Sequence, residues 1–106
     1  MMITLAMIRE DLRDIRYYYS QKEMFDAAVG CLGQNEIIEK VERYNELIKS
    51  APVKLYVLYY SLYVKNNTQE SVSNDFSYTP EYIQMLNKKL LKFLQSKINE
   101  KEKKDV

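Results

Sequence analysis

Apolar residues recur at three- and four-residue steps along most of the chain, the spacing of one face of an α-helix. A first helix is predicted over residues 4–28, and we expect Gly30 and Gly33 to end it or to kink the chain. Charges of both signs fill its other face and are interpreted as solvated or as a subunit interface. Its apolar stripe consists of Leu5, Ile8, Leu12, Ile15 and Tyr19.

A second stripe follows, with Asn35 as its predicted N-cap and Lys49 near its end. Two helices joined by a short connection predict a helical hairpin over residues 1–51, used for packing or for dimerisation. The stripe consists of Ile37, Ile38, Val41, Tyr44 and Ile48.

The third predicted helix, over residues 52–65, begins at Pro52, because proline is tolerated in the first turn of a helix but not deep inside it. Its residues are apolar almost all round, from Val53 to Val64. Such a helix is buried on most sides or offers one side to a partner. We therefore expect it to be the central helix of the fold.

Two threonines mark the starts of the remaining helices. Thr68 is the predicted N-cap of a short amphipathic helix over residues 69–76, and Thr79 caps a last helix over residues 80–98. The final residues, 99–106, are rich in lysine and glutamate and are expected to form a flexible tail.

Residues 69–88 fit the template of a helix-turn-helix, in which one helix holds a second at an angle that suits the major groove of DNA. Ser73 supplies the small residue where the two helices touch. Ser77 occupies the position that adopts a left-handed conformation, at a cost of about 1 kcal/mol. The positions that must face inward are apolar: Val72, Phe76, Tyr78, Ile83 and Leu86.

The predicted fold class is therefore all-α, with the N-terminal helical hairpin packed on a C-terminal tri-helical helix-turn-helix unit over residues 52–98. No segment has the alternating pattern of a strand. Tyr56 to Val64 has a strand-like composition, but its length and its start at a proline favour helix.

From Pro52 through Tyr63, and along the run from Thr68 to Leu94, the chain resembles the C-terminal domain, region four, of bacterial sigma factors. It is also similar to small sigma-like regulators of Gram-positive phages and mobile elements. The shared features are the threonine start, the small residue, the apolar plug, the turn and the closing Leu-Lys pattern. The resemblance implies a DNA-binding regulator of transcription with RNA polymerase as a further partner.

Three features depart from that family. The recognition helix holds Glu81 and Gln84 where arginines are common, and Leu55 to Val57 are apolar where the family is half charged. We expect residues 1–50 to cover that apolar face. Nothing upstream of Pro52 resembles the promoter-melting region, so the resemblance implies an activator or half of a split factor rather than a complete sigma factor.

The outward residues of the last helix are the candidate contacts to double-stranded DNA. Glu81 is suited to accept from a cytosine amine, Gln84 to bridge an adenine and Met85 to pack on a thymine methyl. As alternatives, Glu81 stabilises the helix N-terminus, Gln84 is an ordinary exposed residue and Met85 covers the edge of the core. Tyr82 is a candidate DNA contact too, although its position also belongs to the apolar inner face of the last helix. For the lysines among the predicted phosphate contacts, a solvated face is the alternative. These predicted contacts are Thr68, Thr79, Lys88, Lys89 and Lys92.

The overall charge of +1 does not by itself favour nucleic-acid binding, but its distribution is uneven. Residues 1–52 carry 7 basic and 9 acidic side chains, a net of −2, whereas residues 79–106 carry 7 lysines and 4 acids, a net of +3. A basic end on an otherwise acidic chain is a weak electrostatic footprint for DNA.

The composition argues against an enzyme, a cofactor and a metal site. The chain has no histidine, which removes the commonest general base and metal ligand, and its only glycines, Gly30 and Gly33, form no phosphate-binding loop. The single cysteine, Cys31, excludes an intramolecular disulfide and is expected to be a buried thiol. The apolar N-terminal run is too short for a signal peptide or a membrane span, which predicts a cytoplasmic protein.

Two other functions remain open. In the first, a protein-binding adaptor uses the helix-turn-helix or the tyrosine-rich helix to contact RNA polymerase or a second copy, with residues 4–28 as the first place to look for a homodimer interface. In the second, the ten tyrosines stack single-stranded bases. The latter is disfavoured because that mode needs a basic groove beside the rings, which the sequence does not provide there. Core or interface packing is the commoner role of such rings.

Overall fold

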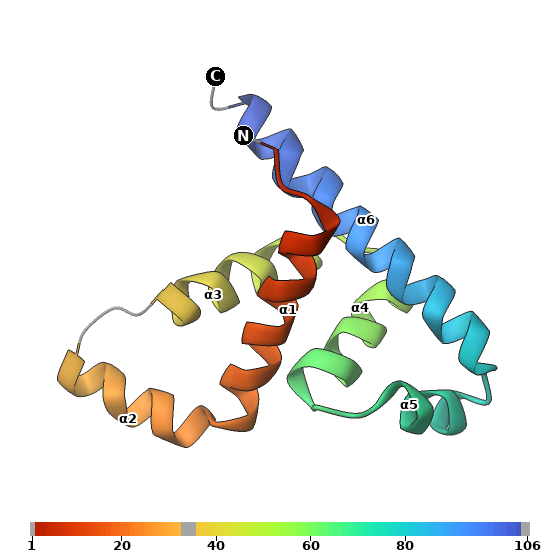
Figure 1. The fold of residues 1–106 in the computed structure, drawn as a ribbon, viewed down its shortest axis with the longest axis horizontal. Coiled ribbons are helices and arrows are strands. Elements are labelled where there is room, and N and C mark those ends of the chain that lie inside the picture. The colour runs from red at the N-terminus through yellow and green to blue at the C-terminus, as the bar shows by residue number, and fades with distance from the viewer. Residues whose placement is uncertain (1, 33–35, 105–106) are drawn as a thin grey trace.

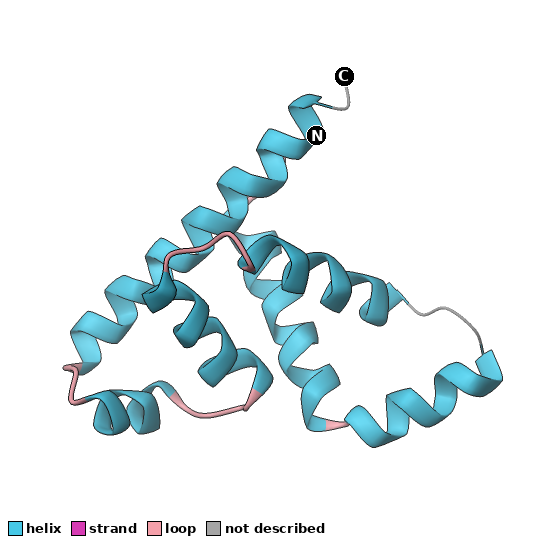
Figure 2. Cartoon of the chain, turned by 180° about the vertical axis from the view of Figure 1, so that it is seen from behind, coloured by secondary structure: helices cyan, strands magenta, loops and turns pink. Residues whose placement is uncertain are grey.

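The computed structural model describes residues 2–32 and 36–104, and within these ranges every regular element is a helix (Figures 1 and 2). The all-α prediction is therefore confirmed. Figure 1 shows α1, α2 and α3 on one side of the molecule and α4 and α5 on the other. The long helix α6 packs against helices of both groups. The elements are α1 (Leu5–Ser20), α2 (Lys22–Leu32), α3 (Glu36–Ile48), α4 (Val53–Tyr59), the π-helix η1 (Tyr60–Val64), α5 (Gln69–Phe76) and α6 (Pro80–Lys104).

The first helix ends earlier than its apolar pattern predicts. A single helix over residues 4–28 is wrong, because Gln21 adopts φ −123° and ψ 32°, outside the helical region, and the chain restarts as α2. The hydroxyl of Ser20 donates to the carbonyl of Tyr17 at 2.7 Å, a side-chain bond that competes with helix continuation. The hydroxyl of Tyr18 then donates to Asp26 at 3.1 Å and holds α2 against the end of α1.

A further helix thus lies where a short connection was expected in the hairpin. The second helix continues through Gly30 to Leu32, so Gly30 does not end it. The predicted roles of Gly33 and Asn35 fall outside the described residues, as does the side chain of Cys31.

Helices α1 and α3 pack together through a cluster of charges around one carboxylate. Asp11 accepts a hydrogen bond from the hydroxyl of Tyr44 at 2.6 Å and lies 3.1 Å from the ammonium of Lys40 and 3.6 Å from the guanidinium of Arg43. Lys40 also reaches Asp14 at 2.7 Å. Burial, together with the carboxylate of Asp11, raises the pKa of Tyr44 and keeps its hydroxyl protonated as the donor. The aspartates of α1 are therefore committed to α3.

The third predicted helix is one helix followed by a wider turn. Pro52 is the N-cap of α4, one residue before the helix begins at Val53. The backbone N–H of Lys65 donates to the carbonyl of Tyr60 at 2.9 Å, the i→i−5 bond of a π-helix. Leu58 and Leu62 are buried, whereas Val53 is 77% exposed. This segment packs on both α1 and α6, so its prediction as the central helix is confirmed.

The last helix continues past the predicted end at residue 98, through Lys104. Ile98 is buried, and the side chain of Asn99 accepts from the backbone N–H of Ile3 at 3.0 Å. Gln95 donates to the carbonyl of Ile3 at 3.2 Å, so the segment before α1 lies along the second half of α6 (Figure 1). The expected tail is therefore helical as far as Lys104, which places most of it within α6.

Replacing Asp11 by alanine tests the packing of α1 on α3. We expect Asp11→Ala to lower the free energy of unfolding by about 1–3 kcal/mol, because the buried hydroxyl of Tyr44 loses its acceptor. Urea unfolding followed by circular dichroism measures this. Glu10→Ala is the matched control, since Glu10 is exposed on the same helix, and it should change stability by less than about 0.5 kcal/mol. Equal effects of the two variants would contradict this packing.

Candidate nucleic-acid interface

The turn between α5 and α6 has the geometry predicted for a helix-turn-helix. Ser77 adopts φ 58° and ψ 35°, the left-handed conformation expected at this position. The backbone N–H of Tyr78 donates to the carbonyl of Ser73 at 2.9 Å, and the hydroxyl of Ser73 donates to the carbonyl of Tyr78. Ser73 is buried, as a small residue at the point of helix contact must be. These bonds fix where α6 begins relative to α5.

Four of the five predicted inward positions point inward. Val72, Ile83 and Leu86 are buried and Tyr78 is half-buried. Phe76 was predicted to plug the end of α5, and this is wrong, because its side chain is 44% exposed and stacks on the ring of Tyr78 with centroids 6.1 Å apart. It ends the helix just where the chain turns away, so one side of its ring has no covering element.

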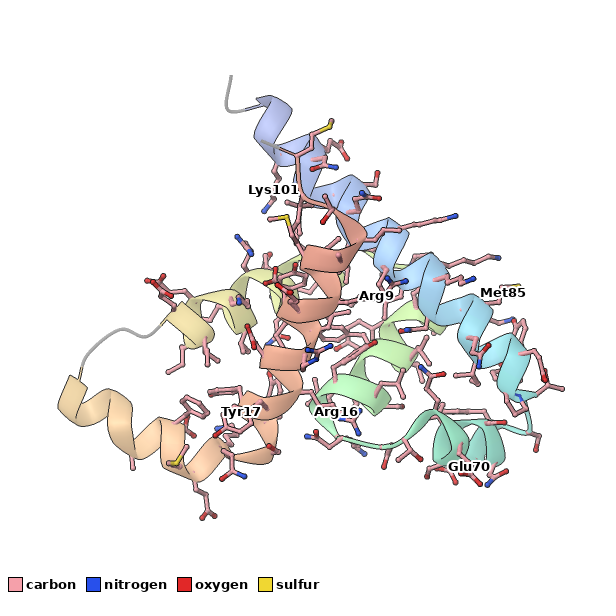
Figure 3. All side chains as sticks on the ribbon, viewed as in Figure 1. Arg9, Arg16, Tyr17, Glu70, Met85 and Lys101 are labelled. Carbon is pink, nitrogen blue, oxygen red and sulfur yellow. The ribbon has the colours of Figure 1, made fainter. Side chains whose placement is uncertain are left out.

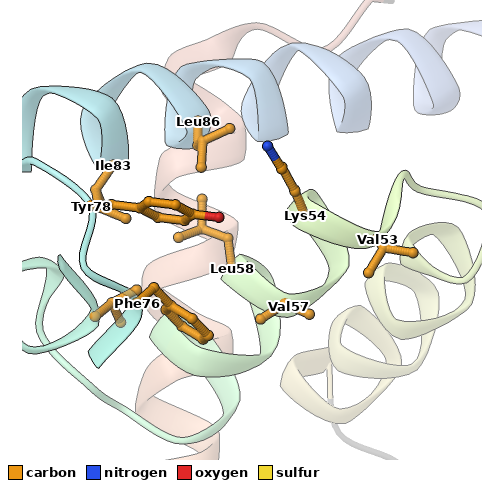
Figure 4. Close-up of a pocket in the computed structure, with 9 residues that line it drawn as sticks. Val53, Lys54, Val57, Leu58, Phe76, Tyr78, Ile83 and Leu86 are labelled. Atoms are coloured by element: carbon orange, nitrogen blue, oxygen red, sulfur yellow. The ribbon is translucent and has the colours of Figure 1, made fainter. Parts of the chain in front are cut away.

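An open apolar groove lies beside Phe76 (Figure 4). Its volume is about 210 Å³, and the first half of α4 forms the opposite wall through Val53, Lys54 and Val57. Valine side chains are too short to reach across to the aromatic rings of Phe76 and Tyr78. The groove therefore lies open between the exposed side chains of Val53 and Phe76.

Both predicted threonine caps are confirmed. The hydroxyl oxygen of Thr68 accepts from the backbone N–H of Ser71 at 3.0 Å, and that of Thr79 accepts from the N–H of Tyr82 at 3.1 Å. Each threonine is exposed and each hydroxyl keeps its own hydrogen for a second bond. Each cap therefore presents one outward donor at the start of its helix.

Most of the predicted DNA-contacting side chains are exposed on α6. Tyr82 is the exception, because it is half-buried against α4, accepts from the ammonium of Lys54 at 3.1 Å and packs on Tyr78 with ring centroids 4.8 Å apart. The hydroxyl of Tyr82 is therefore engaged within the protein. The exposed members on α6 are Glu81, Gln84, Met85, Lys88, Lys89 and Lys92.

The three lysines on α6 have no carboxylate partner in the described part of the chain. There, ion pairs involve Lys22, Lys40, Arg43, Lys49 and Lys97. No carboxylate among the described residues therefore neutralises the positive charge of Lys88, Lys89 and Lys92, and this charge attracts anions.

Sequence reasoning missed a second group of cations, Arg9, Arg13 and Arg16 on α1. Figure 3 shows Arg9 and Arg16 on the side of α1 that faces α4 and α6, and Tyr17 on the side of α2. Their four- and three-residue spacing, which places them on one face of a helix, was the available signal. It was read together with the neighbouring acids as a single face of mixed sign.

Comparisons with known proteins leave the resemblance to sigma region four as a hypothesis. No family model matches the chain, and neither a curated protein nor a solved structure does. Within residues 2–32 and 36–104 no helix is both long and apolar enough to cross a membrane. The same residues contain no cluster of three histidine, cysteine, aspartate or glutamate side chains suited to a metal.

Glycine at position 77 tests the turn. We expect Ser77→Gly to raise the free energy of unfolding by about 1 kcal/mol, because glycine enters the left-handed region without the steric cost of a Cβ. Asn74→Gly, inside α5, is the matched control and should lower it by about 0.5–1 kcal/mol. Thermal or urea unfolding distinguishes the signs, and destabilisation by both changes would argue against the left-handed turn.

Proposed function

We propose that the chain is a DNA-binding transcription regulator that inserts the first half of α6 into the major groove. The observation that carries the proposal is the left-handed turn at Ser77, with Ser73 bonded across it to Tyr78, which sets α6 at a fixed position on α5. In that arrangement the outward residues of α6 are exposed. A rigidly held helix with an exposed polar face is the usual reader of base edges.

Base reading is assigned to the first turns of α6. Glu81 and Gln84 are exposed side chains on neighbouring turns, one an acceptor and the other both donor and acceptor. The carboxylate of Glu81 suits a cytosine amine and the amide of Gln84 suits adenine. Met85 is 41% exposed beside them and supplies an apolar contact for a thymine methyl.

Affinity is assigned to phosphate contacts from α6 and from the two caps. Lys88, Lys89 and Lys92 are exposed and have no carboxylate partner among the described residues. Thr68 and Thr79 each have a hydroxyl hydrogen to donate to a phosphate oxygen. Cations that neutralise phosphates release bound counterions, so binding of this kind weakens steeply with salt.

The apolar groove favours a second candidate function, a protein-binding adaptor that contacts RNA polymerase. Val53 and Phe76 are exposed large apolar residues at opposite sides of this groove (Figure 4). An apolar side chain from a partner helix would bury both. The two functions are compatible, because α6 lines the groove only with the buried side chains of Ile83 and Leu86. Its lysines are exposed and do not line the groove.

Salt-dependent binding to duplex DNA tests the leading proposal. Fluorescence anisotropy with random-sequence duplex at several salt concentrations should show binding by the wild type that weakens as salt rises. In Lys88→Ala/Lys89→Ala/Lys92→Ala the slope of log K against log salt should be shallower by about 2.7, if each lysine neutralises one phosphate.

The matched control is Lys22→Ala/Lys49→Ala/Lys101→Ala, which removes the same charge from other parts of the surface. Lys22 and Lys49 are already paired with carboxylates. This control should keep the wild-type slope. No binding by the wild type at low salt would overturn direct DNA binding, and RNA polymerase would then be the first partner to test.

Sequence selectivity tests the assignment of base reading. Selection of binding sites from a random duplex pool should yield a preferred sequence for the wild type. Glu81→Ala/Gln84→Ala should yield a weaker preference, with affinity for random DNA unchanged or increased because a negative charge is lost. An unchanged preference would place base reading elsewhere. Ser96→Ala, an exposed change farther along α6, serves as the control.

A further inference from the structure

The charges of α1 are divided between two sides of the helix. Asp11 and Asp14 face α3, where they bind Lys40 and Arg43. Arg9 and Arg16 lie on the opposite flank of the buried stripe (Figure 3), and helical spacing places Arg13 on the same flank. The face that has charges of both signs in the sequence is therefore divided in the structure. The acidic flank forms ion pairs with α3, and the cationic flank has no carboxylate partner among the described residues.

The cationic flank lies against the same part of the fold as α6. Tyr63 in η1 donates to the amide oxygen of Asn87 at 2.8 Å, next to Lys88 on α6. Burial raises the pKa of this tyrosine, whereas the nearby positive charges of Arg16 and Arg9 act in the opposite direction. Arg9 and Arg16 are therefore close to the tyrosine that contacts α6.

One of the arginines also fixes the segment that leads into α5. Arg16 donates through Nε to the side chain of Asn66 at 3.2 Å, and its terminal nitrogen lies 3.5 Å from the carbonyl of the same residue. Asn66 has φ 61° and stands two residues before the cap Thr68. Arg16 is therefore a positioning residue, and Arg9 and Arg13, both exposed, are left to meet an external anion.

We propose that Arg9 and Arg13 extend the DNA-binding surface onto α1 and contact the phosphate backbone beside the groove that receives α6. The inference rests on the proposed function. Charge complementarity carries it, because a polyanion is the partner that suits arginines and lysines without internal carboxylates on two neighbouring helices.

This assignment gives residues 1–51 a part in binding as well as in packing. The hairpin was expected to cover α4 and η1 or to form a dimer interface. Through α1 it would also add contacts to phosphates, which carry affinity and orientation but no sequence information.

The test uses the full chain and the random-duplex salt titration, with Arg9→Ala/Arg13→Ala as the variant. We expect a slope shallower than wild type by about 1.8. Arg9→Lys/Arg13→Lys should keep the wild-type slope because it keeps both charges. Lys22→Ala/Arg43→Ala, which removes two charges near α2 and α3, is the matched control and should also keep it.

The outcomes separate this inference from the proposed function. If wild type and the alanine variant share one slope while the α6 lysine variant has a shallower one, α6 binds DNA and α1 does not, which overturns the inference alone. If the wild type does not bind DNA, both fail. Sedimentation of the alanine variant completes the test, because conversion of a dimer to a monomer with an unchanged slope would assign the arginines to a subunit interface and overturn the inference.

Discussion

The apolar stripe of α6 is the constraint on which the rest of the fold depends. Its first part, Ile83 and Leu86, closes the helix-turn-helix against α4 and α5, and its last part, with Leu94 and Ile98, is buried where the N-terminal half packs. One rigid helix therefore belongs to both halves of the molecule. Because the two stretches cannot rotate independently, packing α1 and α3 on the far end also restricts which side of α6 faces solvent at the near end.

This arrangement links stability to the exposed cationic surface. The N-terminal segment is bonded to Asn99 and Gln95, so α1 crosses α6 at a defined place. The aspartates of α1 are then drawn to α3, and its arginines remain on the other flank. A surface with positive charge from two helices follows from how the acidic residues are used inside the fold, although the chain as a whole carries a net charge of only +1.

Local rules predicted the parts of the structure that local interactions determine. The caps at Thr68 and Thr79, the small residue Ser73 and the left-handed Ser77 all depend on neighbours within five residues, and all were predicted from residue type and spacing. The lysines of α6 were found because they lie opposite an unambiguous apolar stripe. Tyr82 is different, because whether its hydroxyl is free depends on Lys54, which is distant in sequence.

The remaining features depend on contacts between elements. No glycine or proline near Gln21 predicts the break between α1 and α2. The hydrogen bond from the hydroxyl of Tyr18 to Asp26 stabilises it. Phe76 has the right spacing for a core residue, but only the position of α4 shows that one side of its ring stays open to the groove. The extension of α6 beyond residue 98 depends on Ile3, at the other end of the chain. The arginine flank of α1 could not be separated from its acids without knowing that α3 lies on one side.

The most direct test of the central claim is an NMR titration of ¹⁵N-labelled protein with a short random-sequence DNA duplex. The account predicts that backbone signals from Thr79 to Lys92 and the side-chain Nε–H signals of Arg9 and Arg13 shift together, whereas signals of α2 stay in place. Absence of any shift at low salt, or shifts confined to the groove around Val53 and Phe76, would contradict DNA binding through α6.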